Sequence, residues 1–360
     1  MVTWLRLKPF QASGSKAATF LSVIVVVRNE AENIVHLLED LNRQTYPANK
    51  FEVIIADDSS TDDTFALVEK YIPKAAYPLT IFHLPTDAST LSPKKKGITQ
   101  AISLAQGELI VTTDGDCRVH ANWLALIEEA YQSRQAKLIS GAVTFEQENT
   151  LLEKMQTIEF ASLTGSGACA LQWNFPTMCN GANLAYSKAA FVAVDGFAGI
   201  DHLASGDDEL LMHKIAQKYP HQLFFIKNPA SVVRTRAQVS LGALYQQRKR
   251  WASKWKAYQD WKVSLLAVFI FLSNGCLLLA GSLTLAGVYP FWVFILQVLV
   301  KFGVESLPLA LFLAYLQPSP QAIRRIMLIP LVQLVYPFYV TFFGLVVQKK
   351  GFEWKGRKMK

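Results

Sequence analysis

The sequence predicts an α/β domain built on a parallel sheet, followed by helices that cross a membrane. Segments typical of strands and helices alternate before residue 240, and long uncharged segments bordered by basic residues follow residue 262. Of the 360 residues, 51% are hydrophobic and 18% are charged, which is too apolar for an ordinary soluble enzyme. Four cysteines without CxxC or Cys/His spacing argue against structural zinc and against a disulfide scaffold.

The alternation of strands and helices defines the predicted sheet. Residues 22–27, SVIVVV, form a β-branched run, as expected of a strand that is covered on both faces. Further strands are expected near 51–57, 80–84 and 107–113, and helices near 34–41, 62–72, 96–106 and 122–133. This order predicts parallel strands joined by right-handed crossovers, and such sheets bind ligands at the carboxyl ends of their strands.

Polar residues follow three of the predicted strands, namely Arg28, Asn29 and Glu30, then Asp57 and Asp58, then Asp114 and Asp116. Asp114 and Asp116 flank a glycine, so a turn aims both carboxylates at one point. Mg²⁺ or Mn²⁺ takes one or two carboxylates together with substrate phosphates. An isolated Asp-Gly-Asp is often only a turn, but here it ends a buried strand, which favours a metal site. A single aspartate is enough to cap the next helix, so the other of Asp57 and Asp58 is left to bind a base or ribose.

Five motifs, taken in order, resemble the inverting family 2 glycosyltransferases with the GT-A fold, the Rossmann-like fold of nucleotide-diphospho-sugar transferases. They are VIVVVRNEAENI, IIADDSSTDDT, the Asp-Gly-Asp at 114–116, SGDDEL at 205–210 and the QxxRW pattern at 247–251. The QxxRW pattern is typical of the membrane-bound branch that resembles polysaccharide synthases. The resemblance covers about residues 20–255 and implies a GT-A domain followed by C-terminal transmembrane helices.

The resemblance implies a role for each matching residue. The implied nucleotide-binding residues are Arg28, Asn29, Glu30, Asp57, Asp58 and Asp114, with one lysine of the run Lys94, Lys95 and Lys96, here Lys96, facing the diphosphate. Asp114 and Asp116 would hold the divalent metal. Asp208, or as second choice Asp207, would be the catalytic base. The residues implied at the diphosphate or the acceptor are Gln247, Arg250 and Trp251, with Asn180 and Gly181 in the pocket loop 179–183.

These roles imply a single displacement at the sugar. The metal, Mg²⁺ or Mn²⁺, would offset the negative charge that develops on the leaving diphosphate. The carboxylate base would accept the proton of the incoming hydroxyl, and the anomeric carbon would be inverted. A UDP-sugar is the usual donor in the family, and we expect a lipid or glycan acceptor.

The uncharged segments predict three membrane spans. Residues 263–287 and 326–347 are 25 and 22 residues long without a charge. Both exceed the roughly 20 residues that a helix needs to cross the hydrocarbon core. Residues 289–316 are apolar except for Lys301 and Glu305, whose i, i+4 spacing lets the two charges neutralise each other.

Basic residues cluster at the borders of these segments. The chain carries a net charge of +8, and residues 248–262 and 349–360 together carry +10. Such clusters are typical of juxtamembrane segments that contact lipid, so we expect membrane lipids and no nucleic acid as partners. The predicted division is an amphiphilic segment 1–20, a catalytic domain 21–240, an interface helix 241–262, spans within 263–347 and a basic tail 348–360.

The first twenty residues contain no continuous apolar segment, so we expect no signal peptide and a catalytic domain on the cytoplasmic side of the inner membrane. The amphiphilic start, with Trp4, Leu5, Leu7 and Phe10, would either rest on the membrane surface or be the remnant of a lost helix. Three crossings would place the basic tail outside, against the positive-inside tendency. Either Pro330 and Pro337 bend the last segment into a re-entrant one, or the number of crossings differs by one.

Several readings compete with the addition of a single sugar. Three helices enclose a channel poorly, yet QxxRW keeps a processive polysaccharide synthase subunit, with a membrane partner subunit, as the alternative. A nucleotidyltransferase would use a similar sheet but would need neither QxxRW nor membrane spans. A non-catalytic scaffold of a synthase would be expected to have lost some of Asp114, Asp116, Asp208 and Arg250, and all four are present.

Overall fold

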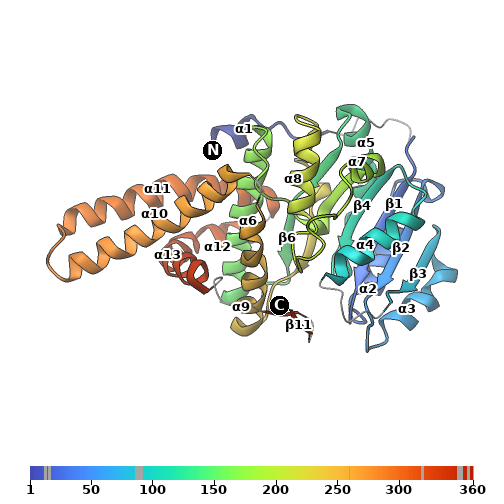
Figure 1. Cartoon of the computed structure of the whole chain (residues 1–360). Helices are drawn as coiled ribbons and strands as arrows, with labels where there is room; N and C mark the ends of the chain where they lie inside the picture. Colours follow the sequence, from blue (N-terminus) through green and yellow to red (C-terminus); the bar gives the residue numbers. More distant parts are fainter. Residues whose placement is uncertain are drawn as a thin grey trace. The chain divides into compact units, whose positions relative to one another are not determined.

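The computed structural model describes residues 1–11, 14, 18–85, 92–258, 260–317, 320–346, 352–354 and 357–359. Figure 1 shows the helices and strands in chain order. The chain divides into two compact units, one of residues 2–147 and 166–236 and the other of Met1, 148–165 and 237–360. The first, the sheet unit, contains the predicted sheet, and the second, the helical unit, contains the apolar helices.

The main sheet confirms the predicted order at its parallel half. Its strands are β3 (Leu79–His83), β2 (Phe51–Asp57), β1 (Leu21–Val27), β4 (Leu109–Asp114), β7 (Leu184–Ser187), β5 (Leu138–Gly141) and β8 (Leu223–Ile226), in that spatial order. The four from β3 to β4 are parallel, but β7 pairs antiparallel with both β4 and β5, so the sheet is mixed. A separate parallel pair is formed by β6 (Val143–Glu146) and β9 (Val233–Arg236).

The helices of the sheet unit lie close to their expected ranges. They are α1 (Val2–Arg6), α2 (Ile34–Asn42), α3 (Thr64–Tyr71), α4 (Pro93–Leu104), α5 (Trp123–Arg134), α7 (Lys188–Ala193) and α8 (Glu209–Lys218). All seven residues of β2 are buried, as the helices on both faces of a parallel sheet require. α4 packs on β1 and β2, and α5 packs on β5 and β8.

Two aromatic side chains of the N-terminal segment pack on the protein. The side chains of Trp4 and Phe10 are buried within the sheet unit. The ammonium of Lys227 lies 4.2 Å from the centre of the Trp4 ring and donates to the carbonyls of Trp4 and Leu7 at 2.7 and 2.9 Å. The side chains of Trp4 and Phe10 are therefore covered by protein, whereas Leu5 of the same segment is exposed.

The helical unit contains the predicted membrane segments. Its helices are α6 (Leu151–Gln172, of which 151–165 belong here), α9 (Leu241–Ala252), α10 (Trp261–Leu285), α11 (Phe291–Leu316), α12 (Pro320–Ile326) and α13 (Ile329–Val346). Among the described residues, α10, α11 and α13 are long and apolar enough to cross a membrane. They coincide within a few residues with the predicted segments 263–287, 289–316 and 326–347. Of the predicted tail 348–360, the structure describes only the strands β10 (Phe352–Trp354) and β11 (Arg357–Met359).

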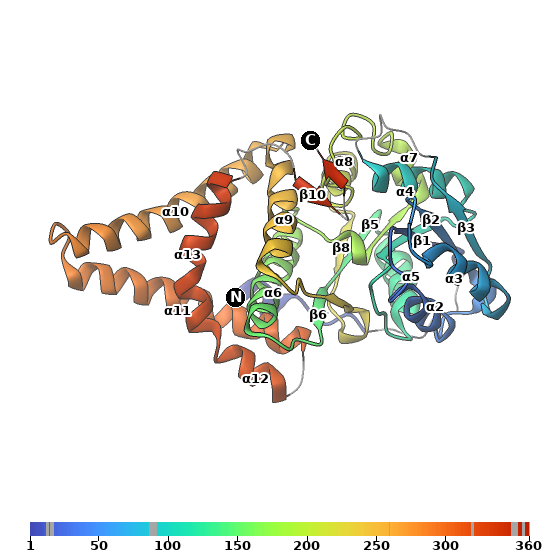
Figure 2. The ribbon, with the colours of Figure 1, turned by 90° about the horizontal axis from the view of Figure 1, so that it is seen from below.

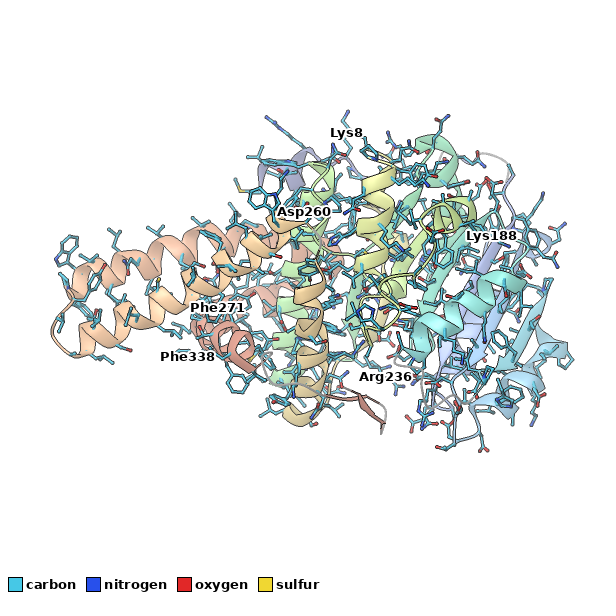
Figure 3. All side chains as sticks on the ribbon, viewed as in Figure 1. Lys8, Lys188, Arg236, Asp260, Phe271 and Phe338 are labelled. Atoms are coloured by element: carbon cyan, nitrogen blue, oxygen red, sulfur yellow. The ribbon has the colours of Figure 1, made fainter. Side chains whose placement is uncertain are left out.

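The apolar side chains of these helices largely point outward. Phe269, Leu299 and Phe338 are each more than half exposed, which suits a hydrocarbon environment better than water. α10 and α11 run side by side in both views (Figure 1 and Figure 2). α13 packs on α10, where Phe271 covers Gly344 so closely that a Cβ there would lie 2.4 Å from the Phe271 ring (Figure 3 labels Phe271 and Phe338).

The predicted ion pair within α11 is formed. The ammonium of Lys301 lies 2.5 Å from a carboxylate oxygen of Glu305, one turn away. Lys301 also lies 5.7 Å from the centre of the Tyr336 ring on α13. The two charges therefore partner each other at the middle of an apolar helix, as a hydrocarbon environment demands.

Candidate active site

The three polar sequences after the parallel strands lie at one edge of the sheet. Val27 pairs with Asp57 and Val26 pairs with Asp114 in the strand register, so β1, β2 and β4 end at the same level. The chain turns sharply after two of them, with positive φ angles at Asn29 and Ser59. The prediction that these sequences meet at the carboxyl edge of the sheet is confirmed.

Arg28 joins the first of these loops to the second. Its guanidinium donates to the carbonyl oxygens of Asp58 and Ser59 at 2.6 and 2.8 Å. The backbone amide of Glu30 donates to the hydroxyl of Thr64 at 2.7 Å. Glu30 and Asp58 are both buried and Asn29 is exposed. The structure thus brings the predicted nucleoside residues together in one loop pair.

Asp57 supplies a buried carboxylate at this edge. One of its oxygens accepts from the amide of Ser60 at 3.2 Å and lies 3.1 Å from Nδ1 of His83. The His83 ring stacks on Phe65 with the ring centres 3.7 Å apart. The other carboxylate oxygen of Asp57 has no hydrogen-bond partner among the described residues, which is costly for a buried acid in the absence of a ligand.

Lys94 and the acidic residues form the centre of the site. The ammonium of Lys94 lies 2.7 Å from Oδ1 of Asp114 and 3.2 Å from Oδ2 of Asp207. Burial alone would lower the pKa of Lys94, but the charges of Asp114 and Asp207 outweigh it and raise that pKa above its ordinary value. Lys94 therefore stays charged and holds acids from two distant parts of the chain together.

The loop around Gly181 closes the other side of this centre. The Gly181 amide donates to Oδ2 of Asp208 at 3.1 Å, while Oδ1 of Asp208 accepts from the Glu209 amide at 2.7 Å and caps α8. A Cβ at position 181 would lie 3.2 Å from Oδ2 of Asp207 and 3.6 Å from the ammonium of Lys94. Asn180 shapes the loop, since its side chain accepts from the Ala182 amide at 2.9 Å.

The three lysines of the run differ in their contacts. Lys95 is buried and donates to three carbonyls of the loop before Asp207, those of Ile200, Leu203 and Ser205. The ammonium of Lys96, the candidate from sequence, lies 3.5 Å from the Pro85 carbonyl, whereas that of Lys94 lies 2.7 Å from Asp114 and 3.2 Å from Asp207. The sequence contains a signal for this difference. Lys94 and Lys95 precede buried Ile98 by four and three residues, so helical periodicity places them on the same face of α4 as Ile98.

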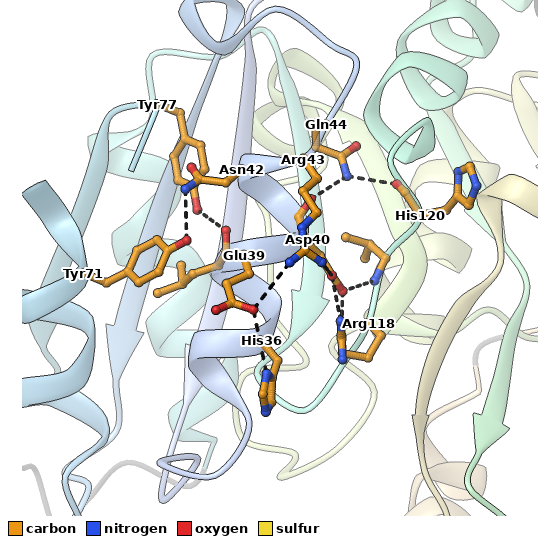
Figure 4. Close-up of polar contacts among 12 residues, drawn as sticks. His36, Glu39, Asp40, Asn42, Arg43, Gln44, Tyr71, Tyr77, Arg118 and His120 are labelled. Carbon is orange, nitrogen blue, oxygen red and sulfur yellow. Dashed lines mark hydrogen bonds and ion pairs between the residues drawn. The ribbon is translucent and has the colours of Figure 1, made fainter. Parts of the chain in front are cut away.

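Side-chain contacts within the sheet unit hold the loop that carries Asp114 and Asp116 in place. Oδ2 of Asp116 accepts from the hydroxyl of Thr235 at 3.0 Å. Two residues on, Arg118 makes a forked contact with Asp40 of α2 at 2.6 and 2.8 Å (Figure 4). Hydrogen bonding to Asp40 raises the pKa of Arg118 further above its ordinary value. The loop is therefore fixed before any ligand arrives.

The residues present fit a divalent cation that also contacts phosphate. Asp114 and Asp116 are both partly exposed at the turn, and Mg²⁺ binds through one or two carboxylates plus substrate oxygens. Burial, followed by the charges of Asp116 and Asp114, raises the pKa of the adjacent Cys117 thiol well above its usual range. Within the described residues there is no group of three His, Cys, Asp or Glu that holds a metal unaided.

The QxxRW residues belong to the helical unit, on α9. Gln247 accepts from the guanidinium of Arg248 at 2.5 Å, and that guanidinium lies 4.2 Å from the centre of the Trp251 ring. Arg250 is partly exposed and has no ion pair among the described residues. Sequence reasoning singled out Gln247, Arg250 and Trp251, and it missed Arg248 between them.

Comparison with known proteins places this chain among sugar transferases. A model described as "Glycosyl transferase family group 2" matches residues 109–345, and one described as "Glycosyl transferase family 2" matches residues 22–195. The chain is 33% identical over 131 residues to Glycosyltransferase AglE of Haloferax volcanii, covering 36% of this chain and 41% of that protein. It is 29% identical over 131 residues to Beta-monoglucosyldiacylglycerol synthase of Nostoc sp., covering 36% and 27%.

A longer match reaches the Poly-beta-1,6-N-acetyl-D-glucosamine synthase of Staphylococcus epidermidis, 23% identical over 238 residues, covering 64% of this chain and 53% of that protein. The matches therefore span less than two thirds of each of these relatives. Among solved structures, the mannosyltransferase PcManGT from Pyrobaculum calidifontis, in complex with GDP-Man and Mn²⁺, has a TM-score of 0.56 at 19% identity. That match covers 95% of this chain and 92% of that chain. It shows that the two proteins share a fold.

Proposed function

The chain belongs to glycosyl transferase family 2, and on that premise we propose that it is a membrane-bound, inverting transferase. It moves a sugar from a nucleotide-diphosphate sugar to a lipid or glycan acceptor at the cytoplasmic face of the inner membrane. The observation that carries the proposal is the convergence of Lys94, Asp114, Asp207 and Asp208 around Gly181 at the carboxyl edge of the sheet.

The sheet edge offers a separate place for each part of the donor. The buried carboxylates of Asp57 and Asp58, beside Arg28, bind the nucleoside, since a base or ribose hydroxyl donates to such oxygens. Lys94 and the Asp114 loop bind the diphosphate. A UDP-sugar is the donor we propose to test first, and a GDP-sugar second because the structural neighbour PcManGT is described with GDP-Man.

Asp114 and Asp116 hold the divalent cation in this proposal. The structural neighbour is described with Mn²⁺, and Mg²⁺ takes the same oxygen ligands. When bound, such a cation offsets the charge that develops on the leaving diphosphate. Lys94 supplies a further positive charge to the same oxygens, and Arg250 of α9 is the proposed forked donor.

Asp208 is the proposed base for the incoming hydroxyl. Its two oxygens each accept one backbone amide, from Gly181 at 3.1 Å and from Glu209 at 2.7 Å, which holds the carboxylate in a fixed orientation beside the Gly181 loop. Asp207, the second choice, is occupied by Lys94 at 3.2 Å. Attack by the hydroxyl on the face opposite the diphosphate inverts the anomeric carbon, so an α-linked donor gives a β-linked product.

The acceptor side of the proposal rests on the apolar helices and on the relatives' names. A chain with three candidate spans works next to lipid, and one relative is named as a synthase of a glucosyl diacylglycerol. The catalytic side is cytoplasmic in this proposal because basic residues 248–262 flank the first span. Gln247 and Trp251, with Asn180 and Gly181, are the proposed acceptor and sugar contacts.

A processive polysaccharide synthase subunit, working with a membrane partner subunit, is the second candidate. The QxxRW pattern and the match to the poly-N-acetylglucosamine synthase favour it. The two candidates differ in product: a single transfer adds one sugar mass to the acceptor, whereas a processive enzyme gives a ladder of masses. The mass spectrum of the product decides between them.

The experiment uses the full chain purified in detergent, a panel of UDP- and GDP-sugars, extracted membrane lipids, and Mn²⁺ or Mg²⁺. We expect one donor to release its nucleoside diphosphate and to add its sugar mass to a lipid or glycan. Asp208→Asn should abolish transfer, and Asp201→Asn, at an exposed acid 3.9 Å from His202, should leave it unchanged. Transfer that survives Asp208→Asn contradicts the assignment of the base, and no transfer from any donor contradicts the proposed function.

A further inference from the structure

We infer that Arg248, Glu159 and Tyr339 form a positioning cluster that fixes the QxxRW helix α9 on helices α6 and α13. Through this cluster a candidate membrane helix sets the orientation of Gln247 and Trp251. The inference rests on the proposed function, because it assigns the cluster's purpose to the motif that contacts the diphosphate or the acceptor. Arg248 occupies one of the two unspecified positions of the motif, and its partners lie 89 and 91 residues away in the sequence.

The three side chains close a ring of hydrogen bonds. One terminal nitrogen of Arg248 donates to Oε2 of Glu159 at 2.7 Å, and Nε of Arg248 lies 3.2 Å from Oε1. Nε also lies 2.7 Å from the hydroxyl oxygen of Tyr339, which in turn donates to Oε1 of Glu159 at 2.7 Å. Each member therefore contacts both of the others, and each comes from a different helix.

The cluster is buried, which distinguishes it from an ordinary surface ion pair. The side chain of Arg248 is 5% exposed and that of Glu159 is 13% exposed. Exposed pairs contribute little because water screens them, whereas loss of one partner of a buried pair leaves an uncompensated charge. Alternative positions of α9 are therefore strongly disfavoured, since each would separate the guanidinium from the carboxylate.

Arg248 also contacts two of the residues that define the motif. A second terminal nitrogen donates to Oε1 of Gln247 at 2.5 Å, and the guanidinium carbon lies over the Trp251 ring, 4.2 Å from its centre. Trp251 packs in turn on Phe160 of α6, with ring centres 5.9 Å apart. One planar group thus orients Gln247, Trp251 and the helix that carries them.

The chemistry of the cluster requires arginine rather than lysine. The guanidinium presents several donors in one plane, which lets it bind Glu159, Tyr339 and Gln247 at once while its face covers Trp251. A lysine ammonium keeps the charge but has neither the fork nor the flat face. Arg248→Lys is therefore expected to release Gln247 and Trp251 while it preserves the ion pair.

The test compares Tyr339→Phe with Tyr336→Phe in the full chain. Tyr339→Phe removes only the hydroxyl that bridges Arg248 and Glu159. Tyr336 lies one turn earlier on α13, where its ring stacks on the Tyr339 ring with centres 6.0 Å apart and lies 5.7 Å from the ammonium of Lys301. Phenylalanine keeps that ring, so the control loses the same atom while the stacking on Tyr339 and the hydroxyl of Tyr339 remain. We expect Tyr339→Phe and Arg248→Lys to lower kcat/KM about ten- to hundredfold, chiefly through a higher KM, and the control to match the parent.

Hydrogen exchange of the α9 amides gives a readout that needs no activity. Exchange over residues 241–252 should be faster in Tyr339→Phe than in the parent or in the Tyr336→Phe control. If the variant merely lost folded protein, kcat would fall and KM would stay unchanged. That result would contradict the positioning role. The same exchange rate, or the same KM, in Tyr339→Phe and the parent also overturns the inference. A parent that is inactive with all donors counts against the proposed function instead, and the exchange rates still decide whether the cluster fixes α9.

Discussion

Gly181→Ala tests the arrangement of the active site without altering any charge. Gly181 does not have a left-handed backbone, so the backbone tolerates alanine. Its amide keeps the hydrogen bond to Asp208, because alanine retains the N–H. The only change is a methyl group placed between Lys94, Asp207 and Asp208.

The distances set the expected magnitude. The new Cβ would lie 3.2 Å from Oδ2 of Asp207, 3.5 Å from Cβ of Asp208 and 3.6 Å from the ammonium of Lys94. The last two are ordinary contacts and the first needs a shift of a few tenths of an ångström, so we expect less than about 1 kcal/mol of destabilisation. For catalysis, a misplacement of about 1 Å costs roughly a hundredfold, and this smaller shift, with space lost to the methyl group, predicts a ten- to hundredfold loss of kcat/KM.

The assay is nucleoside diphosphate release with the preferred donor, alongside thermal unfolding of the same samples. Gly242→Ala on α9 is the control, because its Cβ would meet nothing within 4 Å. The control should keep parental activity and stability. Parental activity in Gly181→Ala would refute the placement of the sugar beside Gly181, and an equally large loss in Gly242→Ala would show that the effect is not specific to this loop.

Three further predictions concern the acids and the lysine run. Asp116→Ala should abolish metal-dependent transfer while costing about 1 kcal/mol of stability for the lost Thr235 bond, measured by transfer and by thermal unfolding. Lys94→Met should lower kcat/KM at least about a hundredfold, while Lys96→Met should stay within about threefold; equal effects would contradict the assignment of Lys94. Burial raises the pKa of Asp62, but hydrogen bonds donated by Thr64 and Ala31 outweigh it and lower that pKa, so this group stabilises the fold above its unfolded pKa of about 4 and loses that effect as the pH falls through the folded value. The difference in Tm between the parent and Asp62→Asn should therefore shrink as the pH falls below about 4, and a constant difference would contradict this.

Much of the fold could be predicted from the sequence because its strongest signals are local. The β-branched run at 22–27 and the uncharged segments after 262 determine their own structure, by burial on both faces and by length. The pair Lys301 and Glu305 was predicted from helical spacing, and the structure forms it. The antiparallel strand β7 was missed, because a strand of only four residues, LAYS, carries no sequence signal of its direction.

The sequence predicted the kinds of residue in the candidate site better than it predicted the individual residues. The acids after β2 and β4 follow from the rule for parallel sheets, whereas the choice among three adjacent lysines required their helical phase. Lys96 precedes Thr99 and Gln100 on the outer face of α4, and this periodicity was available in the sequence. Arg248 is different, because its partners Glu159 and Tyr339 are distant in the chain and nothing near it signals them.

Binding of Mn²⁺ in the presence of a nucleoside diphosphate tests the account most directly. Electron paramagnetic resonance of free Mn²⁺ can be followed during titration of the purified chain, with UDP or GDP, for the parent and for the double variant Asp114→Asn, Asp116→Asn. We expect the parent to take up one Mn²⁺ per chain together with one of the nucleotides, and the double variant to take up none. Equal uptake by parent and variant would contradict the claim that these two carboxylates bring a cation and a donor diphosphate together.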